Sequence, residues 1–263
     1  SGYIMVNISG LNFTVYETDH EISQHICRRI SKGTGFPLTT IEKFKPGPAI
    51  IYGKLRGCKA ALEANLQAGN PTLMVDHGYF SSRDQFGHWR FTLNSFDDPG
   101  KLIDLPADRW EHFGRELKPY REEGEHILIL SPSSFWAYFG NFNQHIWDWH
   151  RTQELQEYTD LPVVVKDKRD ETPLQEYLKN AKAVVHYASM GGLAALEQGV
   201  PVITLGPSFL KDYTNTQISD INSLKHPERE KLFCNLAYRQ FTFSEILSGF
   251  AWQTITKIYK EAY

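Results

Sequence analysis

The segment from Ala183 to Gly206 constrains the fold of this chain more than any other. It contains an apolar run (183–188), the break Ser-Met-Gly-Gly, a short stretch rich in Ala and Leu that ends at Gly199, and a second β-branched run (200–205). Apolar runs that are too short for a helix are typical of strands buried on both faces of a parallel sheet. Gly199 is a typical helix end. The segment therefore predicts a compact strand–helix–strand unit.

The turn that leads into the predicted helix has features of an anion site. Ser189 is a favourable N-cap residue, and Gly191 and Gly192 after Met190 leave room for a bulky group close to the first backbone N–H groups. Those N–H groups carry partial positive charge, so that a phosphate fits there. The same residues also suit an ordinary capped crossover that binds nothing, and both interpretations are open on these residues alone.

Basic residues follow the strand that is predicted one unit earlier. A run of three valines is followed by Lys166, Lys168 and Arg169. In an open parallel sheet, ligands bind outside the carboxyl ends of neighbouring strands. We therefore expect these cations to converge with His186 and Ser189 on one diphosphate, through charge-assisted hydrogen bonds.

The first half of the chain repeats this pattern. It predicts a strand at 49–52, a helix from about residue 57 to 68 and a strand at 72–76, and the polar pair Asp76 and His77 ends that strand. A carboxylate or an imidazole in this position is suited to take a proton from a hydroxyl group. The alternative is that Asp76 only caps a turn.

Two further segments border the same predicted edges. Residues 88–94 alternate between apolar and polar side chains, which predicts a strand. Its polar face, which includes Arg90 and Asn94, meets either an acceptor molecule or only water. The aromatic segment 135–139 follows another predicted strand (126–130) and either covers a nucleobase or a sugar or packs internally.

Composition limits the classes of protein to which the chain can belong. Its 263 residues, 41% hydrophobic and 22% charged, are typical of a soluble globular protein with one large or two small domains. The formal net charge of -3 does not indicate a nucleic-acid-binding protein, although a local basic cleft is compatible with it. Three separated cysteines without a Cys-x-x-Cys pair favour reduced thiols in the cytoplasm rather than disulfides or zinc. No segment has the ~20 apolar residues of a membrane span, and the N-terminus has no signal-peptide pattern.

The motifs resemble a known family. Ser-x-x-Gly-Leu-x-Ala-Leu-x-x-Gly-Val-Pro-Val-Ile from Ser189, the basic strand end before it and the Leu-Gly-Pro-Ser-Phe that follows are similar to the nucleotide-sugar half of GT-B glycosyltransferases. The chain especially resembles the capsule-polysaccharide type and small bacteriophage glycosyltransferases proposed to modify hydroxymethylated pyrimidines in DNA. Tyr-Gly-x-x-Arg-Gly from Tyr52 and Asp-x-Gly-Tyr from Asp76 are also similar to the phage enzymes. One departure is Ala194, where many GT-B enzymes have a glutamate for the ribose; Glu197 is the nearest carboxylate.

The resemblance implies an α/β fold of the GT-B type, with two Rossmann-like parallel-sheet lobes and a cleft between them. Residues 1–122 form the expected acceptor-binding lobe, 123–241 the nucleotide-sugar-binding lobe, and 242–263 a C-terminal helix that crosses back to the first lobe. The acidic segment 122–125 is the expected hinge, and Thr242-x-x-Glu245 is a capping box for the last helical segment.

The implied activity is transfer of a sugar from a nucleotide-diphosphate sugar, UDP-linked by preference, to a hydroxyl acceptor. The first choice of acceptor is a 5-hydroxymethylated pyrimidine in phage DNA, reached through a basic entrance that includes Arg56, Arg83 and Arg90. A surface or capsular glycan is the alternative acceptor, and a nucleotide-sugar epimerase or a non-catalytic nucleotide-sugar-binding protein is an alternative function. Since no Asp-x-Asp motif is present, we expect a metal-independent reaction without a cofactor, in which the nucleotide sugar is a co-substrate.

The site residues that these patterns and the resemblance imply fall into three groups. Asp76, ahead of His77, is the expected catalytic base. The expected acceptor-binding residues are Arg56, Tyr79, Arg90 and Asn94. The expected donor-binding residues are Lys166, Lys168, Arg169, His186, Ser189, Met190, Gly191, Gly192 and Glu197. No metal ligand is expected, and the oligomeric state is left open.

Overall fold

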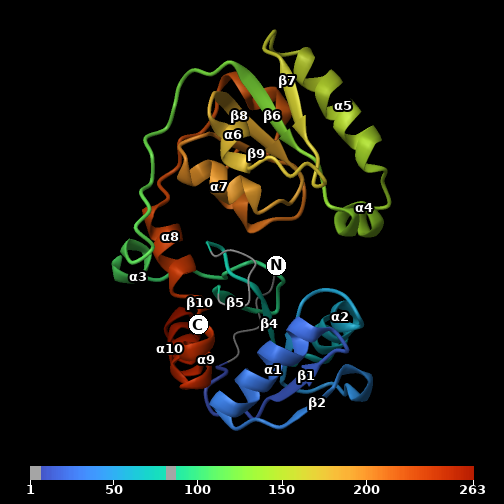
Figure 1. Cartoon of the computed structure of the whole chain (residues 1–263), viewed down its shortest axis with the longest axis vertical. Helices are drawn as coiled ribbons and strands as arrows, with labels where there is room; N and C mark the ends of the chain where they lie inside the picture. The colour runs from blue at the N-terminus through green and yellow to red at the C-terminus, as the bar shows by residue number, and fades with distance from the viewer. Residues whose placement is uncertain (1–6, 81–86) are drawn as a thin grey trace. The chain divides into compact units, whose positions relative to one another are not determined.

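The computed structural model describes residues 7–80 and 87–263, and the chain divides into two compact units (Figure 1). Unit 1 comprises residues 1–113 and 231–263, and unit 2 comprises residues 114–230. The chain therefore leaves unit 1 before the expected hinge at 122–125, and it returns at residue 231 rather than at 242. Arg83, one residue of the expected basic entrance, lies outside the described residues.

Unit 1 is built on a six-stranded sheet in the order β10-β5-β4-β3-β1-β2. The strands β2, β1, β3 and β4 are parallel, whereas β5 and β10 are antiparallel to their neighbours. The first strand lies inside the sheet between β2 and β3, so that the strand order reverses beside it. The strands are β1 (Thr14–Glu17), β2 (Leu38–Thr40), β3 (Ala49–Tyr52), β4 (Thr72–His77), β5 (Trp89–Leu93) and β10 (Gln240–Phe241).

Helices from both ends of the chain belong to unit 1. In α1 (Glu21–Thr34), Ile26 and Ile30 lie one turn apart on the buried face. The capping box predicted at Thr242 and Glu245 is confirmed, since each side chain accepts a hydrogen bond from the other residue's backbone N–H. The other helices are η1 (Ile41–Lys43), α2 (Cys58–Ala68), α3 (Asp108–Glu111), α8 (Glu230–Ala237), which begins at the boundary, α9 (Phe243–Leu247) and α10 (Phe250–Ala262).

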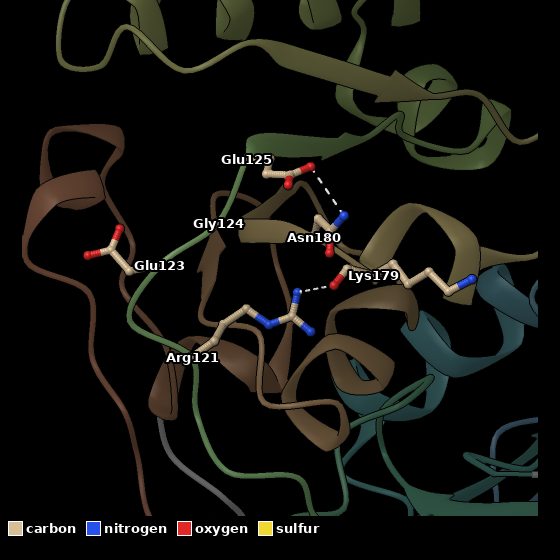
Figure 2. A pocket seen from close by; sticks show the side chains of 6 residues that line it. All are labelled: Arg121, Glu123, Gly124, Glu125, Lys179 and Asn180. Atoms are coloured by element: carbon tan, nitrogen blue, oxygen red, sulfur yellow. Dashed lines mark hydrogen bonds between the residues drawn. The ribbon is translucent and has the colours of Figure 1, made fainter.

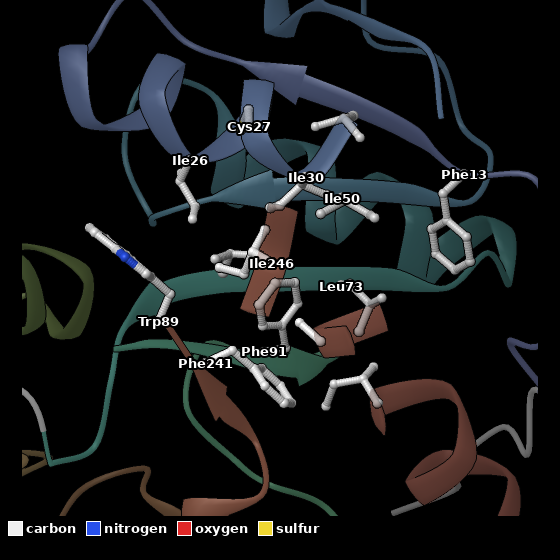
Figure 3. Close-up of a cluster of buried hydrophobic side chains, with 14 of the residues drawn as sticks. Phe13, Ile26, Cys27, Ile30, Ile50, Leu73, Trp89, Phe91, Phe241 and Ile246 are labelled. Carbon is white, nitrogen blue, oxygen red and sulfur yellow. The ribbon is translucent and has the colours of Figure 1, made fainter. Parts of the chain in front are cut away.

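One hydrophobic cluster joins the two chain segments of unit 1 (Figure 3). Ile26 comes from α1, Ile50 and Leu73 come from neighbouring parallel strands, and Phe241 and Ile246 come from the C-terminal segment. All five side chains are buried. Because burial of apolar surface is the main favourable term in folding, the C-terminal segment is an integral part of this core.

Unit 2 is built on a four-stranded parallel sheet in the order β7-β6-β8-β9. The predicted strand–helix–strand unit is confirmed, as β8 (Ala181–His186), α7 (Gly191–Glu197) and β9 (Val202–Thr204). Ile127, Val185 and Ile203 contribute to the core of this unit. The other elements are β6 (His126–Leu130), α4 (Ser134–Gly140), α5 (Gln144–Gln156), β7 (Val163–Lys166), α6 (Leu174–Leu178), η2 (Phe209–Asp212) and η3 (Ile218–Asn222).

Candidate functional site

The carboxyl edge of the unit 2 sheet is the first candidate site. The first strand of this unit, β6, lies between β7 and β8, so that the strand order reverses between β6 and β8. In open α/β sheets, ligands bind outside the carboxyl ends of the strands at such a reversal. Most of the predicted donor residues lie at the ends of β7 and β8 or directly after them, and the loop that leaves β6 leads into the aromatic segment.

Two of the predicted donor residues come together there. Lys168 follows β7 and is exposed, and its Nζ lies 3.3 Å from Oγ of Ser189, which follows β8. Lys166 is half-buried, donates a hydrogen bond to the carbonyl oxygen of Asp170 (2.7 Å), and has its Nζ 5.3 Å from the ring centroid of Tyr177. The loops that follow two strands separated by β6 thus meet through Lys168 and Ser189.

Arg169 is exposed, like Lys168. Its side chain is 79% exposed and binds Asp167 through Nε (3.1 Å) and Nη2 (3.0 Å). The hydrogen bonds from Arg169 lower the pKa of Asp167 to about 2. The two side chains therefore form a surface ion pair, and a phosphate has to compete with Asp167 for this guanidinium.

His186 requires a correction. Its side chain is fully buried, its Nδ1 accepts a hydrogen bond from the backbone N–H of Ser189 (2.8 Å), and its Nε2 lies 2.9 Å from Oγ1 of Thr204. Burial lowers the pKa of His186 to about 3, so that the ring is neutral near pH 7. The ring therefore holds the turn that carries Ser189, and its predicted part in donor binding would act through that turn.

The glycines of this turn also require a correction. A Cβ atom on Gly192 would lie 2.7 Å from Nε2 of His186, and one on Gly191 would lie 2.5 Å from Cδ1 of Leu130. The backbone N–H of Gly191 donates to Oγ of Ser189 (3.1 Å), and that of Gly192 donates to the Ser189 carbonyl oxygen (3.1 Å). The glycines thus allow close internal packing, and these two amides are already paired. Met190 is half-buried and occupies the N-cap position that was expected for Ser189.

Glu197 is the third correction. It lies at the last position of α7 and is 3% exposed. Arg115 binds both of its carboxylate oxygens at 2.6 Å, through Nε and Nη2. This pair satisfies the carboxylate inside unit 2, and a ribose would have to displace Arg115 in order to bind it.

The aromatic segment lies at the same edge as Lys168. Helix α4 begins directly after the loop that leaves β6, and the Trp136 ring lies 6.0 Å, centroid to centroid, from the ring of Tyr187, which follows β8. Phe142 also contacts Tyr187, at 5.1 Å. Tyr138 is 80% exposed and Phe139 is 43% exposed. The β6/β8 reversal is therefore bordered by aromatic rings, which are suited to stack on a base or a sugar.

The carboxyl edge of the unit 1 sheet is the second candidate site. Oδ1 of Asp76 accepts a hydrogen bond from the backbone N–H of His77 (2.8 Å), and Oδ2 lies 3.8 Å from Nη2 of Arg90. Nε2 of His77 lies 3.3 Å from the hydroxyl oxygen of Tyr52. The side chain of Asp76 is 22% exposed, so that a substrate can reach it. This arrangement fits a base that acts at the surface.

The predicted acceptor residues do not all lie near Asp76. Asn94 binds Thr72 at the amino end of β4, through its N–H to the Thr72 carbonyl oxygen and through Oδ1 to the Thr72 N–H (both 2.8 Å). Since Asp76 is four residues further along the strand, which corresponds to about 13 Å, Asn94 is not part of this site. The hydroxyl group of Tyr79 donates to the carbonyl oxygen of Asp97 (2.6 Å).

The two predicted acceptor arginines differ in exposure. Arg56, in the loop after β3, is 48% exposed and has Nη1 2.6 Å from Oδ1 of Asp19, in the loop after β1. This ion pair lies at the strand-order reversal of unit 1. Arg90 is 6% exposed, and its guanidinium binds backbone carbonyl oxygens. Of the expected basic entrance, the structure therefore describes Arg56, which is ion-paired, and Arg90, which is buried.

Lys54 and Asp97 are charged residues near Asp76 that the sequence motifs did not identify as site residues. Nζ of Lys54 lies 5.4 Å from the ring centroid of Phe96. Burial lowers the pKa of Lys54 and raises the pKa of Asp97, and each is also affected by the charges of the other, of Arg90 and of Asp76. Lys54 follows β3 at the carboxyl edge of the sheet, and this position in the sequence could have identified it as a site residue. Asp97 comes from a segment with the composition of a turn.

Among the described residues, two pockets are lined by residues other than the predicted catalytic and donor residues. One, of about 390 Å³, is lined by Arg121, Glu123, Gly124, Glu125, Lys179 and Asn180 (Figure 2). Glu125 directly precedes β6 and Asn180 directly precedes β8, so this hollow lies at the amino edge of the unit 2 sheet. Arg121 donates there to the carbonyl oxygens of Leu178 (2.7 Å) and Lys179 (2.8 Å). The second, of about 410 Å³, is in unit 1 and is lined in part by Arg109 and His112.

The described residues contain neither a candidate metal cluster nor a candidate membrane-spanning helix. Within 7–80 and 87–263, no group of three or more His, Cys, Asp or Glu side chains is arranged to hold a metal ion. No described helix is both long enough and apolar enough to cross a membrane.

Comparisons with known proteins identify the fold. No family model and no curated protein matches the chain. A solved structure from Thermosulfurimonas dismutans, described as KpsC, beta Kdo 2,4 transferase, matches with a TM-score of 0.55 and 12% identity, over 86% of this chain and 90% of that chain. A second, described as KpsC, beta Kdo 2,7 transferase from the same organism, has a TM-score of 0.56 and 12% identity, over 92% of this chain and 99% of that chain.

These matches agree with the architecture of the two units. Both known structures are described as Kdo transferases, and the similarity covers 86% and 92% of this chain. The fold is the α/β fold of GT-B glycosyltransferases, with two units that are each built on a mainly or wholly parallel sheet. At 12% identity the similarity concerns the fold.

Proposed function

We propose that the protein is a glycosyltransferase that moves a sugar from a nucleotide-linked donor to a hydroxyl group of a glycan. The observation that carries this proposal is the similarity in fold to two Kdo transferases over at least 86% of the chain. Each unit also has polar side chains at the carboxyl edge of its sheet, where ligands of α/β proteins bind. Fold alone does not define an activity, so the site residues of each unit carry the rest of the argument.

In this proposal, unit 2 binds the donor. Lys168 and Ser189 meet at the strand-order reversal, and Lys168 supplies positive charge for the donor phosphate. A cation in this place stabilises the negative charge that develops on the leaving nucleotide. Trp136 and Tyr187 supply aromatic surface for the base or the sugar. The proposed donor is a nucleotide-diphosphate sugar, and we expect that the reaction requires no metal ion.

Unit 1 supplies the base, which we propose is Asp76. The acceptor oxygen forms a bond with the anomeric carbon of the sugar, and its own O–H bond breaks. The proton passes to the carboxylate of Asp76, while the bond from the anomeric carbon to the phosphate oxygen breaks and its electron pair leaves with the nucleotide. A positioned base of this kind typically contributes about 100- to 10,000-fold to the rate.

A glycan is favoured over DNA as the acceptor. The two known proteins are described as Kdo transferases, and Kdo is a sugar. The charge of Arg56 is paired with Asp19, and Arg90 is buried, so neither is available at the surface as an uncompensated cation for a DNA phosphate. DNA that carries 5-hydroxymethylated pyrimidines therefore remains as the second acceptor to be tested.

The test is a panel of nucleotide sugars offered with a hydroxyl-rich bacterial glycan or with hydroxymethylated duplex DNA. Sugar transfer to the glycan, measured by mass spectrometry together with release of the nucleotide, is the expected result. Transfer to the duplex instead would replace the glycan by DNA in the proposal. Conversion of the donor without any acceptor would indicate an epimerase, and binding without turnover would indicate a binding protein.

A further inference from the structure

We propose that Arg90 is a positioning residue, which orients the carboxylate of Asp76 so that Oδ2 is the oxygen that receives the acceptor proton. The inference rests on the proposed function, because it assigns a role within the same reaction. It also gives Arg90 a role different from direct binding of the acceptor, which its position in the sequence suggested.

Arg90 lies in β5, beside the carboxyl end of β4, and several hydrogen bonds hold its side chain. It is 6% exposed and lies opposite Asp76 in the antiparallel pair of β5 and β4. Its Nη1 donates to the carbonyl oxygen of His77 (2.6 Å), and its Nε and Nη2 donate to the carbonyl oxygen of Phe96 (3.3 and 3.2 Å). The guanidinium therefore ties the strand end to the loop after β5, and a planar fork of this kind fixes geometry in a way that an ammonium group does not.

The two oxygens of Asp76 are not equivalent in this arrangement. Oδ1 is bound by the backbone N–H of His77 at 2.8 Å. Oδ2 lies 3.8 Å from Nη2 of Arg90, which is close enough for electrostatic attraction but too long for a direct hydrogen bond. Oδ2 thus keeps the capacity to accept a hydrogen bond from a substrate hydroxyl group, while Arg90 and His77 restrict the rotation of the carboxylate.

Other charged or titratable groups surround this pair. Lys54 from the loop after β3 and Asp97 from the loop after β5 act electrostatically on each other, on Asp76 and on Arg90. The ring centroid of Tyr79 lies 5.5 Å from Cζ of Arg90. Cys58, at the start of α2, is a buried thiol whose pKa Asp76 raises further, and His77 adjoins Asp76 in the strand. Arg90 is the cation with the ion-pair contact to Asp76, at 3.8 Å, so its replacement tests the positioning directly.

The proton transfer is balanced within this cluster. When Oδ2 takes the proton from the acceptor hydroxyl group, Asp76 becomes neutral and the acceptor oxygen gains its new bond to the anomeric carbon. The positive charge of Arg90 remains in place throughout. Arg90 therefore exchanges no proton, and its contribution is orientation of the base.

The experiment compares Arg90→Lys and Arg90→Met with Asp76→Asn and with Arg109→Lys as a control. Arg109 is a comparable control because it is also a partly buried arginine of unit 1 that donates to backbone carbonyl oxygens, of Ala237 and Gln240, and pairs with a carboxylate, Glu245. Folding of each variant is checked by circular dichroism and thermal unfolding. Sugar transfer is then measured as kcat and KM over a range of pH, and crystal structures locate the Asp76 carboxylate.

We expect Arg90→Lys to lower kcat about 10- to 100-fold with little change in the KM for the donor, since misplacement of a catalytic group by about 1 Å costs that much. In Arg90→Met, kcat should fall at least as far, because both the guanidinium fork and the positive charge beside Oδ2 are removed. The Asp76 carboxylate should take a different rotamer in both structures. Arg109→Lys should lose stability but keep the pH profile.

The outcomes separate the inference from the proposed function. If Asp76→Asn loses transfer but Arg90→Lys retains the kcat, the pH profile and the Asp76 rotamer of the wild type, the inference is wrong and the function stands. If Arg90→Met does not fold, Arg90→Lys decides by the same criteria. If the wild-type protein transfers no sugar from any donor of the panel, the proposed function and the inference both fail. The crystal structures give a separate test: an Asp76 rotamer that is unchanged in the Arg90 variants would show that Arg90 does not orient the carboxylate.

Discussion

The two units share one arrangement of strands and differ in how they hold charge at the same edge of the sheet. In both, the first strand lies between the second and the third, as β2-β1-β3-β4 in unit 1 and β7-β6-β8-β9 in unit 2. At the carboxyl edge of unit 1, Arg90 is buried beside the partly exposed Asp76. At the carboxyl edge of unit 2, Lys168 and Arg169 are exposed.

This difference suggests that the same scaffold serves two kinds of task. A buried, hydrogen-bonded charge has a fixed position, because moving it out of its partners costs free energy. Exposed cations are mobile and screened by salt, which suits the capture and release of a charged ligand. We infer that unit 1 holds the group that reacts and unit 2 holds the charge that binds.

The largest effect is expected for the buried charge of unit 1, Arg90, and it is measured as a change in the free energy of unfolding. Replacing Arg90 by Met leaves the carbonyl oxygens of His77 and Phe96 without this donor and removes a buried cation beside Asp76. We expect the free energy of unfolding to fall by about 3 to 5 kcal/mol, measured by urea denaturation. The matched variant in unit 2 is Arg169→Met, which removes an exposed arginine and should leave the midpoint of urea denaturation almost unchanged. Equal losses in the two variants would contradict the comparison.

The second prediction concerns the reaction. Asp76→Asn keeps the size of the side chain and its ability to accept from the His77 N–H, but it removes the base. We expect kcat to fall at least about 100-fold, or about 2.7 kcal/mol, because base catalysis contributes that much or more. Affinity for the donor, measured by titration calorimetry, should stay within a factor of two or so of the wild type. A loss of donor affinity together with an unchanged kcat would place Asp76 in the donor site instead.

The sequence was sufficient to predict the main elements but not the direction of every side chain. The unit from β8 to β9 was predictable because its short apolar runs and glycine punctuation agree with each other. By contrast, the contact of Glu197 with Arg115 spans 82 residues, and nothing local in the sequence indicates it. The same holds for His186, whose partner Thr204 belongs to the next strand. A polar residue near a strand end is therefore identified by its sequence position, whereas its partners decide whether it faces a ligand or the core.

Asn94 and Lys54 illustrate the same limit in unit 1. Alternation along 88–94 placed Asn94 on one face with Arg90, but it did not show that β5 runs antiparallel to β4. This direction moves Asn94 to the opposite end of β4 from Asp76. The position of Lys54 after β3 places it at the carboxyl edge, but its surroundings, Phe96 and Asp97, come from a segment whose composition indicates only a turn.

The third prediction uses the buried titratable group at the edge of unit 2. The pKa of His186 is about 3 in the folded chain, and an unfolded histidine has a pKa of about 6.5. Below about pH 6.5 the unfolded chain binds a proton that the folded chain does not, so stability falls with acidification through this window. Between about pH 6.5 and 5, this one group should lower the free energy of unfolding by about 2 kcal/mol.

The control for this prediction is His186→Asn, whose Oδ1 can accept from the Ser189 N–H in place of Nδ1. The variant lacks the titrating imidazole, so its stability should depend less on pH over the same window. Urea denaturation at several pH values measures the difference between the two proteins. Parallel pH profiles for the wild type and the variant would show that His186 is not buried as a neutral ring.

The smallest expected effect tests the exposed side of the comparison. Lys168→Met removes the cation that lies 3.3 Å from Ser189, and we expect donor affinity to fall about 10-fold, or about 1.4 kcal/mol, with the free energy of unfolding unchanged within about 0.5 kcal/mol. Lys179→Met is the matched control, because Lys179 is also an exposed lysine of unit 2 but lies at the amino edge of the sheet. Since Lys168 is exposed, the difference between the two variants should shrink as salt is raised from about 50 to 500 mM. Equal affinities of the two variants for the donor at low salt would mean that the donor binds elsewhere. The inference that the carboxyl edge of unit 2 binds the donor would then be wrong.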